Sequence, residues 1–292
     1  MTAFKQFRVE PGEKFRLKDR DPADSAGFES KQDARKRLTQ GIERLRELQE
    51  RFYACDRWAL LIVFQAMDAA GKDSTIEHVM SGVNPQGCQV YSFKQPSAEE
   101  LDHDYLWRTN RCLPERGRIG VFNRSYYEEV LVVRVHPGLL AAEKLPPQLV
   151  DEDIWKRRFK EINTFERYLA HNGVAVVKFY LHVSKEEQRR RFLARLDEPE
   201  KNWKFSLSDV KEREHWDEYM EAYEDMLGHT STEDAPWYVV PADHKWFTRM
   251  AVADIVVSTL EKLKPEFPTI TEEKRRELDA ARKVLEKEEV KG

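Results

Sequence analysis

The sequence has few cysteines, and their positions argue against two kinds of site. Only three occur among 292 residues, at Cys55, Cys88 and Cys112. They lack the close spacing of metal ligands, and an odd number makes a poor disulfide framework. We therefore expect free thiols, which are usual in a reducing cytosol.

Long apolar runs and a strong net charge are also lacking. The N-terminal residues 1–8 contain no apolar core of a secretory signal, and no later run reaches the length of a membrane span. The 49 basic residues nearly balance the 53 acidic ones, giving a net charge of −4. This balance argues against a general nucleic-acid binder, so any polyanion must be bound by a local group of cations. We predict a soluble, cytoplasmic protein without a membrane or nucleic-acid partner.

What the chain does contain is an alternation of strand-like and helix-like segments. Apolar runs typical of buried strands cover residues 58–64, 87–93, 118–123, 174–183 and 236–241. Helical patterns cover residues 31–54, 72–82, 98–112, 151–172, 184–196, 209–228 and 244–264. Such an alternation predicts an α/β fold, a doubly wound parallel sheet with helices on both faces. Ligands of these folds bind at the carboxyl ends of the strands.

The two ends of the chain differ from this pattern. Residues 1–30 are rich in charge, proline and glycine, and we expect an extended N-terminal arm lying on the body. The main domain is predicted to span residues 31–266. Residues 267–292 contain a charged helical stretch, which is expected either to be solvated or to contact another subunit.

The segment from Leu60 to Ile76 is the most informative in the chain. An apolar strand enters a turn of small residues that ends in Gly71-Lys72, and a helix follows directly. This layout is typical of a phosphate-binding loop, in which backbone N–H groups and the helix N-terminus face an anion. The predicted phosphate-binding residues are Ala69, Ala70, Gly71, Lys72, Asp73 and Ser74. The alternative is an ordinary strand-to-helix turn with a solvated lysine.

The loop departs from the strict pattern at two positions. Ala66 stands where glycine is usual, and Asp73 stands where a serine or threonine would bind magnesium. In place of that hydroxyl, the carboxylate of Asp68 lies inside the loop. A carboxylate beside phosphates is favourable mainly when a divalent cation lies between them. Asp68 is therefore a predicted metal ligand.

A further motif follows the strand that ends near Phe122. Asn123 occupies the position of the usual Walker B aspartate, and Glu128, about one helical turn onward, is placed to supply the missing charge. Arg124 has the planar guanidinium suited to bridging phosphate oxygens. The alternative is a strand end whose Asn123 and Ser125 cap a helix, and both interpretations can hold together.

A third motif combines arginines with an interrupted helix. Arginines lie on successive turns before Pro199, and Lys201 and Lys204 then flank Trp203. In mononucleotide kinases, an arginine-bearing lid at this place closes over the phosphates and excludes water. We predict a lid at about residues 189–216. The competing interpretation is a solvated helix face, because acidic residues are interleaved.

With these three motifs, the chain resembles the polyphosphate kinase 2 family from about Lys14 to Lys264. The family's loop motif is similar to Asp-Ala-Ala-Gly-Lys, here Asp68 to Lys72. Its strand-end motif is similar to Asp/Asn-Arg-Ser-x-Tyr, here Asn123 to Tyr127. The lid motif is matched at Arg191, Arg195, Pro199, Lys201, Trp203 and Lys204. The stretches 93–96 and 102–108 also resemble the family.

The resemblance implies a fold, a reaction and a set of partners. The fold would be that of a P-loop kinase similar to thymidylate kinase, with three α/β/α layers around a parallel sheet and a helical lid. The reaction would be reversible phosphoryl transfer from inorganic polyphosphate to nucleoside mono- or diphosphates, with Mg²⁺ or Mn²⁺. The departures at Ala66 and Asn123 resemble the subgroup that accepts both AMP and ADP, with GMP and GDP as further candidate acceptors. A homo-oligomer, either a dimer or a tetramer, is expected.

The resemblance and the motifs together give each candidate residue a role. The expected catalytic residues are Asp68, Lys72, Arg124, Glu128 and Arg195, and the metal ligands among them are Asp68 and Glu128. The expected polyphosphate-binding residues outside the loop are Lys94, Arg134, Arg191, Lys201 and Lys204. The expected nucleotide-binding residues are Asp104, Trp107, Arg108, Asn123 and Tyr127.

Three other functions compete with this interpretation. An ATP-dependent nucleoside monophosphate kinase would need an adenine pocket for the donor. A nucleotide-binding switch protein is disfavoured because no Asn-Lys-x-Asp element follows the later strands. A polyphosphate-storage protein without catalysis is disfavoured by Lys72 and the two carboxylates. The sequence leaves open the base of the acceptor, the choice between AMP and ADP, the polymer length and the direction of transfer.

Overall fold

A single parallel sheet forms the centre of the molecule. The computed structural model describes residues 4–12 and 14–288. The strands are β1 (Ala59–Gln65), β2 (Cys88–Ser92), β3 (Ile119–Asn123), β4 (Val174–His182) and β5 (Trp237–Pro241). They pair in the order β2-β3-β1-β4-β5, and all four pairings are parallel. The predicted doubly wound parallel sheet is confirmed.

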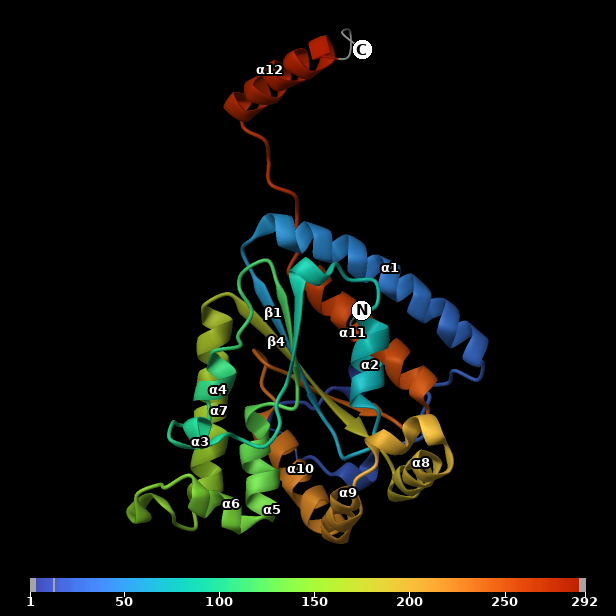
Figure 1. Cartoon of the computed structure of the whole chain (residues 1–292), viewed down its shortest axis with the longest axis vertical. Coiled ribbons are helices and arrows are strands. Elements are labelled where there is room, and N and C mark those ends of the chain that lie inside the picture. The colour runs from blue at the N-terminus through green and yellow to red at the C-terminus, as the bar shows by residue number, and fades with distance from the viewer. Residues whose placement is uncertain (1–3, 13, 289–292) are drawn as a thin grey trace.

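Helices cover both faces of this sheet (Figure 1). One face carries α1 (Lys31–Cys55), α2 (Lys72–Val79) and α11 (Lys245–Lys262). The other carries α5 (Val132–Val135), α7 (Ile154–His171) and α10 (Trp216–Thr230). All seven residues of β1 are buried, as expected of a central strand covered on both sides. The expected three-layer α/β/α fold is therefore confirmed.

Side chains at the ends of two helices explain where those helices begin. The hydroxyl of Ser30 accepts hydrogen bonds from the backbone N–H groups of Gln32 and Asp33 at the start of α1. In the same way, Ser184 accepts a bond from the N–H of Glu187 at the start of α8 (Lys185–Asp197). These contacts satisfy N–H groups that have no partner within the helix.

Two helix predictions were wrong. Residues 98–112 form two short helices, α3 (Ala98–Leu101) and α4 (Trp107–Asn110), because the Asp104 carboxylate accepts from the N–H of Leu106 and stabilises a turn between them. Residues 209–228 are divided into α9 (Leu207–Glu212), a 3₁₀ turn (Arg213–His215) and α10. At this break, the Arg213 guanidinium donates to Lys185 O and Gln188 Oε1 of α8, so tertiary contacts accompany the interruption.

The chain between β3 and α7 begins with a turn capped by Ser125, as the alternative interpretation of the strand-end motif expected, and continues with helices that the sequence patterns did not predict. A 3₁₀ turn (Tyr126–Val130) is followed by α5 and by α6 (Pro137–Ala142). These elements are too short to show a helical period, which explains why periodicity does not detect them.

The two ends of the described chain are arranged differently. Residues 4–12 and 14–30 lie against the body, with Phe7, Val9 and Leu17 buried and the N–H of Val9 bonded to Trp237 O. At the other end, α12 (Glu272–Glu288) extends away from the sheet, as Figure 1 shows. The final residues of the predicted C-terminal helix, 289–292, lie outside the described residues. Within the part of the chain that the structure describes, no helix combines the length and apolarity of a membrane span.

Candidate active site

The phosphate loop and the strand-end motif meet at the carboxyl edge of the sheet. β1 and β3 are neighbours, with Phe64 aligned to Asn123. The backbone N–H of Arg124 donates to the carbonyl of Phe64 at 3.0 Å. The two segments therefore leave the sheet side by side, although they are more than fifty residues apart in the sequence.

The loop adopts the strained backbone of an anion-binding turn. Ala69 and Gly71 have positive φ angles of 60° and 104°, and α2 begins directly afterwards at Lys72. Left-handed residues beside a helix N-terminus produce the concave arrangement of N–H groups that binds anions. A residue other than glycine at position 71 would be strained by its φ value alone.

Lys72 lies at the centre of opposing charges. Its side chain is only 9% exposed, and Nζ donates to Ala66 O at 2.7 Å. Burial, followed by the positive charge of Arg124, lowers the pKa of Lys72, whereas the carboxylates of Asp68, Glu128 and Asp73 raise it. The ammonium group therefore lies within the field of three carboxylates and one guanidinium.

Arg124 interacts with the charges of both candidate metal ligands, Asp68 and Glu128. One of its terminal nitrogens lies 3.1 Å from Asp68 Oδ1. Burial lowers the pKa of Arg124, but the carboxylates of Glu128 and Asp68 outweigh this effect and leave that pKa above its usual value. The backbone at Arg124 is left-handed, with φ of 64°. Asp68, Glu128, Lys72 and Arg124 are therefore brought together by the fold.

The two carboxylates fit a magnesium ion that also binds phosphate. Magnesium is held in proteins by one or two carboxylates together with substrate phosphates and water. Asp68 and Glu128 supply two such groups beside the loop. Among residues 4–12 and 14–288, no group of three or more His, Cys, Asp and Glu side chains is placed to hold a metal ion by itself. A divalent cation bound by Asp68 and Glu128 would take its remaining ligands from phosphate and water.

Side chains of helix α8 donate hydrogen bonds to backbone carbonyls of the phosphate loop. Gln188 Nε2 donates to Asp68 O at 2.9 Å. The guanidinium of Arg191 donates to Ala69 O and Ala70 O at 3.0 and 2.7 Å. It also donates to Ala242 O and Asp243 O, and its Nε to Glu187. Arg191 therefore holds the loop carbonyls, while its predicted contact with polyphosphate stays a prediction.

The remaining lid residues lie farther out. Arg195 contacts Lys204 O and Asp209 Oδ2, each at 3.3 Å. Burial, followed by the negative charge of Asp68, raises the pKa of Asp209. Lys201 forms an ion pair with Glu198, and Lys204 lies over the ring of Trp203, which is 78% exposed. Lys201, Trp203 and Lys204 lie in a 3₁₀ turn, Pro199–Lys204.

A cavity of about 690 Å³ opens beside Arg124 and Glu128. This volume lies in the range of nucleotide and other small-molecule sites. Lys94, Asp104 and Arg108 line it, as do the acidic residues Glu100, Glu129, Glu143 and Glu212.

Other predicted binding residues lie outside the cavity lining. Trp107 stacks on His103 with 3.9 Å between ring centroids, and Tyr127 is fully buried in the core. Asn123 bonds to Asp73, and Arg134 bonds to Asp225 at 2.7 Å.

Comparison with known proteins identifies the family. The family model described as "Polyphosphate kinase 2 (PPK2)" matches residues 28–268. The chain belongs to the polyphosphate kinase 2 family. It is 55% identical to an ADP-polyphosphate phosphotransferase of Rhodopseudomonas palustris, over 96% of this chain and 98% of that protein. It is 47% identical to an AMP/ADP-polyphosphate phosphotransferase of Meiothermus ruber, over 90% and 95% of the two chains.

A solved structure supports the same conclusion. The crystal structure of polyphosphate kinase 2 from Arthrobacter aurescens TC1 matches with a TM-score of 0.85 and 40% identity. The match covers 95% of this chain and 96% of that one. The P-loop kinase fold of this polyphosphate kinase 2 chain is therefore shown by comparison as well as by its sheet order.

Two cations, Lys245 and Arg249, are not marked by the sequence motifs. Lys245 follows β5, and its Cε lies 4.0 Å from where a Cβ on Gly71 would stand. Burial and then the charges of Arg191, Arg249 and Lys201 lower the pKa of Lys245. Arg249 has a buried Nε without a hydrogen-bond partner among the described residues. The rule that ligands bind at strand ends, applied to β5 as well as β1 and β3, would have indicated this position.

An acidic pair on the cavity wall, the buried Glu129 and the half-buried Glu143, was also missed. Glu129 lies 3.0 Å from Arg158 Nε, and another nitrogen of Arg158 lies 3.3 Å from Glu143. Burial and then the Glu143 carboxylate raise the pKa of Glu129 to about 8, although Arg158 opposes the shift. No sequence signal marks this cluster, because Glu129, Glu143 and Arg158 come from different segments of the chain.

Proposed function

We propose that this chain is a polyphosphate-dependent nucleotide kinase that transfers a phosphoryl group from inorganic polyphosphate to ADP and AMP. The observation that carries the proposal is the convergence of Lys72, Asp68, Arg124 and Glu128 beside a cavity large enough for a nucleotide. The names of the relatives from R. palustris and M. ruber support the donor and the acceptors. A relative named GDP-polyphosphate phosphotransferase makes guanine nucleotides further candidates.

Positioning and positive charge supply most of the catalysis in this proposal. The transition state of phosphoryl transfer is loose, with charge spread over the equatorial oxygens. Lys72 and the loop N–H groups hold the transferring group, while Arg124 offsets the charge on its oxygens. Asp68 and Glu128 would hold Mg²⁺, which would neutralise phosphate charge and help to align donor and acceptor. No general base is required, because the accepting phosphate is already an anion.

The two substrates occupy different sides of the loop in this proposal. The acceptor nucleotide enters the cavity, where Lys94, Asp104 and Arg108 are available to contact it. Polyphosphate approaches from the side of Lys201, Lys245 and Arg249, whose mutual proximity is unfavourable without an anion. The polymer carries about one charge per unit, so its binding should weaken as salt rises.

A product assay tests the proposal directly. Purified protein with Mg²⁺ and polyphosphate is incubated with AMP, ADP, GMP or GDP, and the nucleotides are separated by chromatography. A parallel reaction replaces polyphosphate with ATP. We expect ATP from ADP, and ADP from AMP, only when polyphosphate is present.

Lys72→Ala is the matched inactive control for this assay. It should retain less than about a tenth of wild-type turnover, which corresponds to a loss of more than ~1.4 kcal/mol in transition-state stabilisation. Equal transfer from ATP to AMP in the absence of polyphosphate would instead indicate an ATP-dependent kinase.

A further inference from the structure

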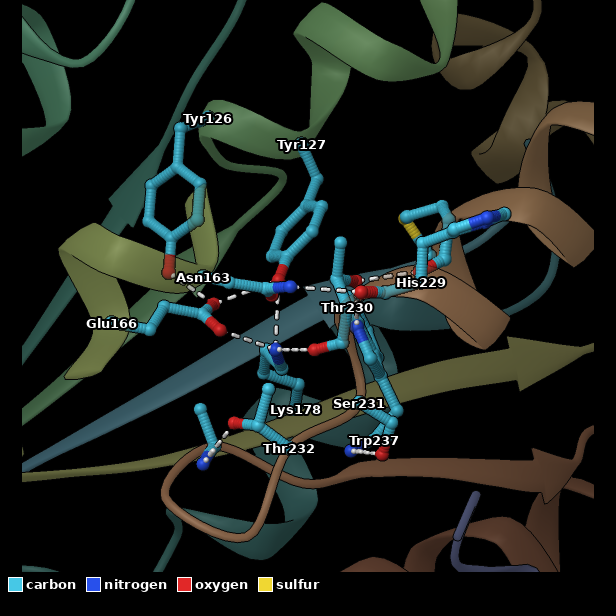
Figure 2. A network of polar contacts seen from close by, with 12 residues as sticks. Tyr126, Tyr127, Asn163, Glu166, Lys178, His229, Thr230, Ser231, Thr232 and Trp237 are labelled. Atoms are coloured by element: carbon cyan, nitrogen blue, oxygen red, sulfur yellow. Dashed lines mark hydrogen bonds and ion pairs between the residues drawn. The ribbon is translucent and has the colours of Figure 1, made fainter. Parts of the chain in front are cut away.

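A charged pair lies in the core and contacts the turn that follows β3. Lys178 of β4 and Glu166 of α7 are both fully buried, with Nζ 2.5 Å from Glu166 Oε2. Glu166 Oε1 accepts hydrogen bonds from the hydroxyls of Tyr126 and Tyr127, each at 2.8 Å. Figure 2 shows both tyrosine rings pointing from the turn after β3 toward this pair.

The polar side-chain groups of Lys178, Glu166, Tyr126, Tyr127 and Thr230 all have partners. Lys178 Nζ donates to Tyr127 Oη at 2.7 Å and to Thr230 O at 2.8 Å, in addition to Glu166 (Figure 2). The hydroxyl of Thr230 accepts from Trp237 Nε1 and donates to Met226 O. A fully satisfied buried network is rigid and specifies one arrangement of the core, whereas an unsatisfied one is costly. The cluster therefore fixes the positions of β4, α7, the end of α10 and the two tyrosines relative to each other.

The two tyrosines belong to the turn that carries catalytic groups of the proposed function. They lie between Arg124, which precedes them, and Glu128, which follows them and lines the cavity. Ser125 adds a local contact, because its hydroxyl accepts from the N–H of Tyr127 at 3.1 Å.

The backbone in front of this turn needs external support. Arg124 is left-handed, with φ of 64°, a conformation unfavourable for a residue with a side chain. Such strain persists only where the surroundings hold the backbone in place. The hydroxyls of Tyr126 and Tyr127, bonded to Glu166, supply two fixed points immediately after the strained residue.

We propose that Glu166 and Lys178 are positioning residues that act through the hydroxyls of Tyr126 and Tyr127 to hold Arg124 and Glu128 in their active arrangement. The inference rests on the proposed function of those two residues. Packing alone would not require the hydroxyls, because the rings already pack edge-on against Phe165 and Trp237.

The test removes the hydroxyls and keeps the rings. The variant is Tyr126→Phe combined with Tyr127→Phe, which keeps the ion pair between Lys178 and Glu166 but removes both donors to Glu166 Oε1. The matched control is Tyr180→Phe, which removes a fully buried hydroxyl from the same strand as Lys178, where its contact is a 3.9 Å bond to the sulfur of Met220. Thermal unfolding, steady-state kinetics at varied Mg²⁺, and hydrogen–deuterium exchange of residues 124–130 are measured for wild type and both variants.

The expected result separates positioning from stability. The double variant should show faster exchange in residues 124–130, at least a tenfold lower kcat and a higher Mg²⁺ requirement, while the KM for polyphosphate changes less than twofold. Tyr180→Phe should change none of these, even if its Tm falls. Unchanged exchange, or unchanged kcat and Mg²⁺ dependence, in the double variant overturns the proposal. An inactive wild type would refute the proposed function instead, while the exchange measurement would still test the positioning.

Discussion

Asn123 Nδ2 donates a 2.6 Å hydrogen bond to Asp73 Oδ1, and this contact connects a departure from the phosphate-loop pattern with a departure from the Walker B pattern. Asp73 stands where a serine or threonine is usual, and Asn123 stands where an aspartate is usual. Because the two residues are in contact, the amide at position 123 compensates for the carboxylate at position 73. The two departures are therefore one coupled feature of the site.

This pairing predicts a rescue between the two positions. Asn123→Asp should bring two carboxylates into contact and lower kcat by roughly tenfold, a cost of ~1.4 kcal/mol. Adding Asp73→Thr should restore kcat to within about threefold of wild type, because it recreates the usual hydroxyl and carboxylate pair. The measurement is a double-mutant cycle of kcat and Tm. Additive losses in the double variant would show that the two positions are independent.

Removing the charges of Asp68 and Glu128 should have non-additive effects on kcat if both carboxylates bind one metal ion. Asp68→Asn and Glu128→Gln should each reduce kcat by at least about tenfold, and the double variant should lose little more. The measurement is the rate against Mg²⁺ concentration for the two single variants and the double. Glu233→Gln, whose carboxylate pairs with Arg8 outside the candidate site, is the control. Wild-type rates with unchanged Mg²⁺ saturation would remove both residues from the metal site.

The cations beside the loop should determine how polyphosphate binding depends on salt. Each cation that contacts the polymer releases counterions, so Lys245→Ala with Arg249→Ala should raise the KM for polyphosphate and flatten its dependence on salt. Lys201→Ala with Lys204→Ala should act in the same direction, while the KM for ADP changes much less in both. KM values at two ionic strengths check this, with Lys274→Ala on α12 as the control. If a double variant leaves the salt dependence of the KM for polyphosphate unchanged, the polymer does not contact the two cations removed in it.

The acidic pair on the cavity wall should make stability depend on pH. Burial raises the pKa of Glu129 to about 8 in the folded protein, above its ordinary value of 4.5. The folded state therefore binds the proton more tightly, and this stabilisation is complete below pH 4.5 and is lost as pH rises toward 8. Glu129→Gln removes this dependence, so its Tm relative to wild type should increase between pH 5.5 and 8.5.

The expected change in Tm scales with the change in the free energy of unfolding. Each kcal/mol of unfolding free energy corresponds to ~2–4 °C in Tm for a protein of about this size. Glu161→Gln is the control, since Glu161 contacts the same Arg158 but is about half exposed. A Tm difference that does not vary with pH for Glu129→Gln would show that this carboxyl is ionised throughout.

Local sequence patterns determined the sheet, the loop and the strand-end motif of this protein. Five largely apolar runs separated by helical periods indicate a parallel sheet, because the inner strands of such a sheet are covered on both faces. Gly71-Lys72 after the first of these runs specifies the phosphate loop, and the carboxyl ends of adjacent strands bring Asn123 and Arg124 beside it. Short helices such as α3 and α4 escape this reasoning, since four residues do not complete a recognisable period.

Tertiary structure decided which charges act together. Arg191 contacts the loop carbonyls, Asn123 contacts Asp73, and Lys178 bonds to Glu166 in the core, yet nothing in the spacing of these residues predicts their partners. Lys245 resembles any lysine at the start of a helix until β5 is placed two strands from β1. The physical reason is that hydrogen bonds and ion pairs act over a few ångströms, and only the folded chain brings groups from distant segments within that range.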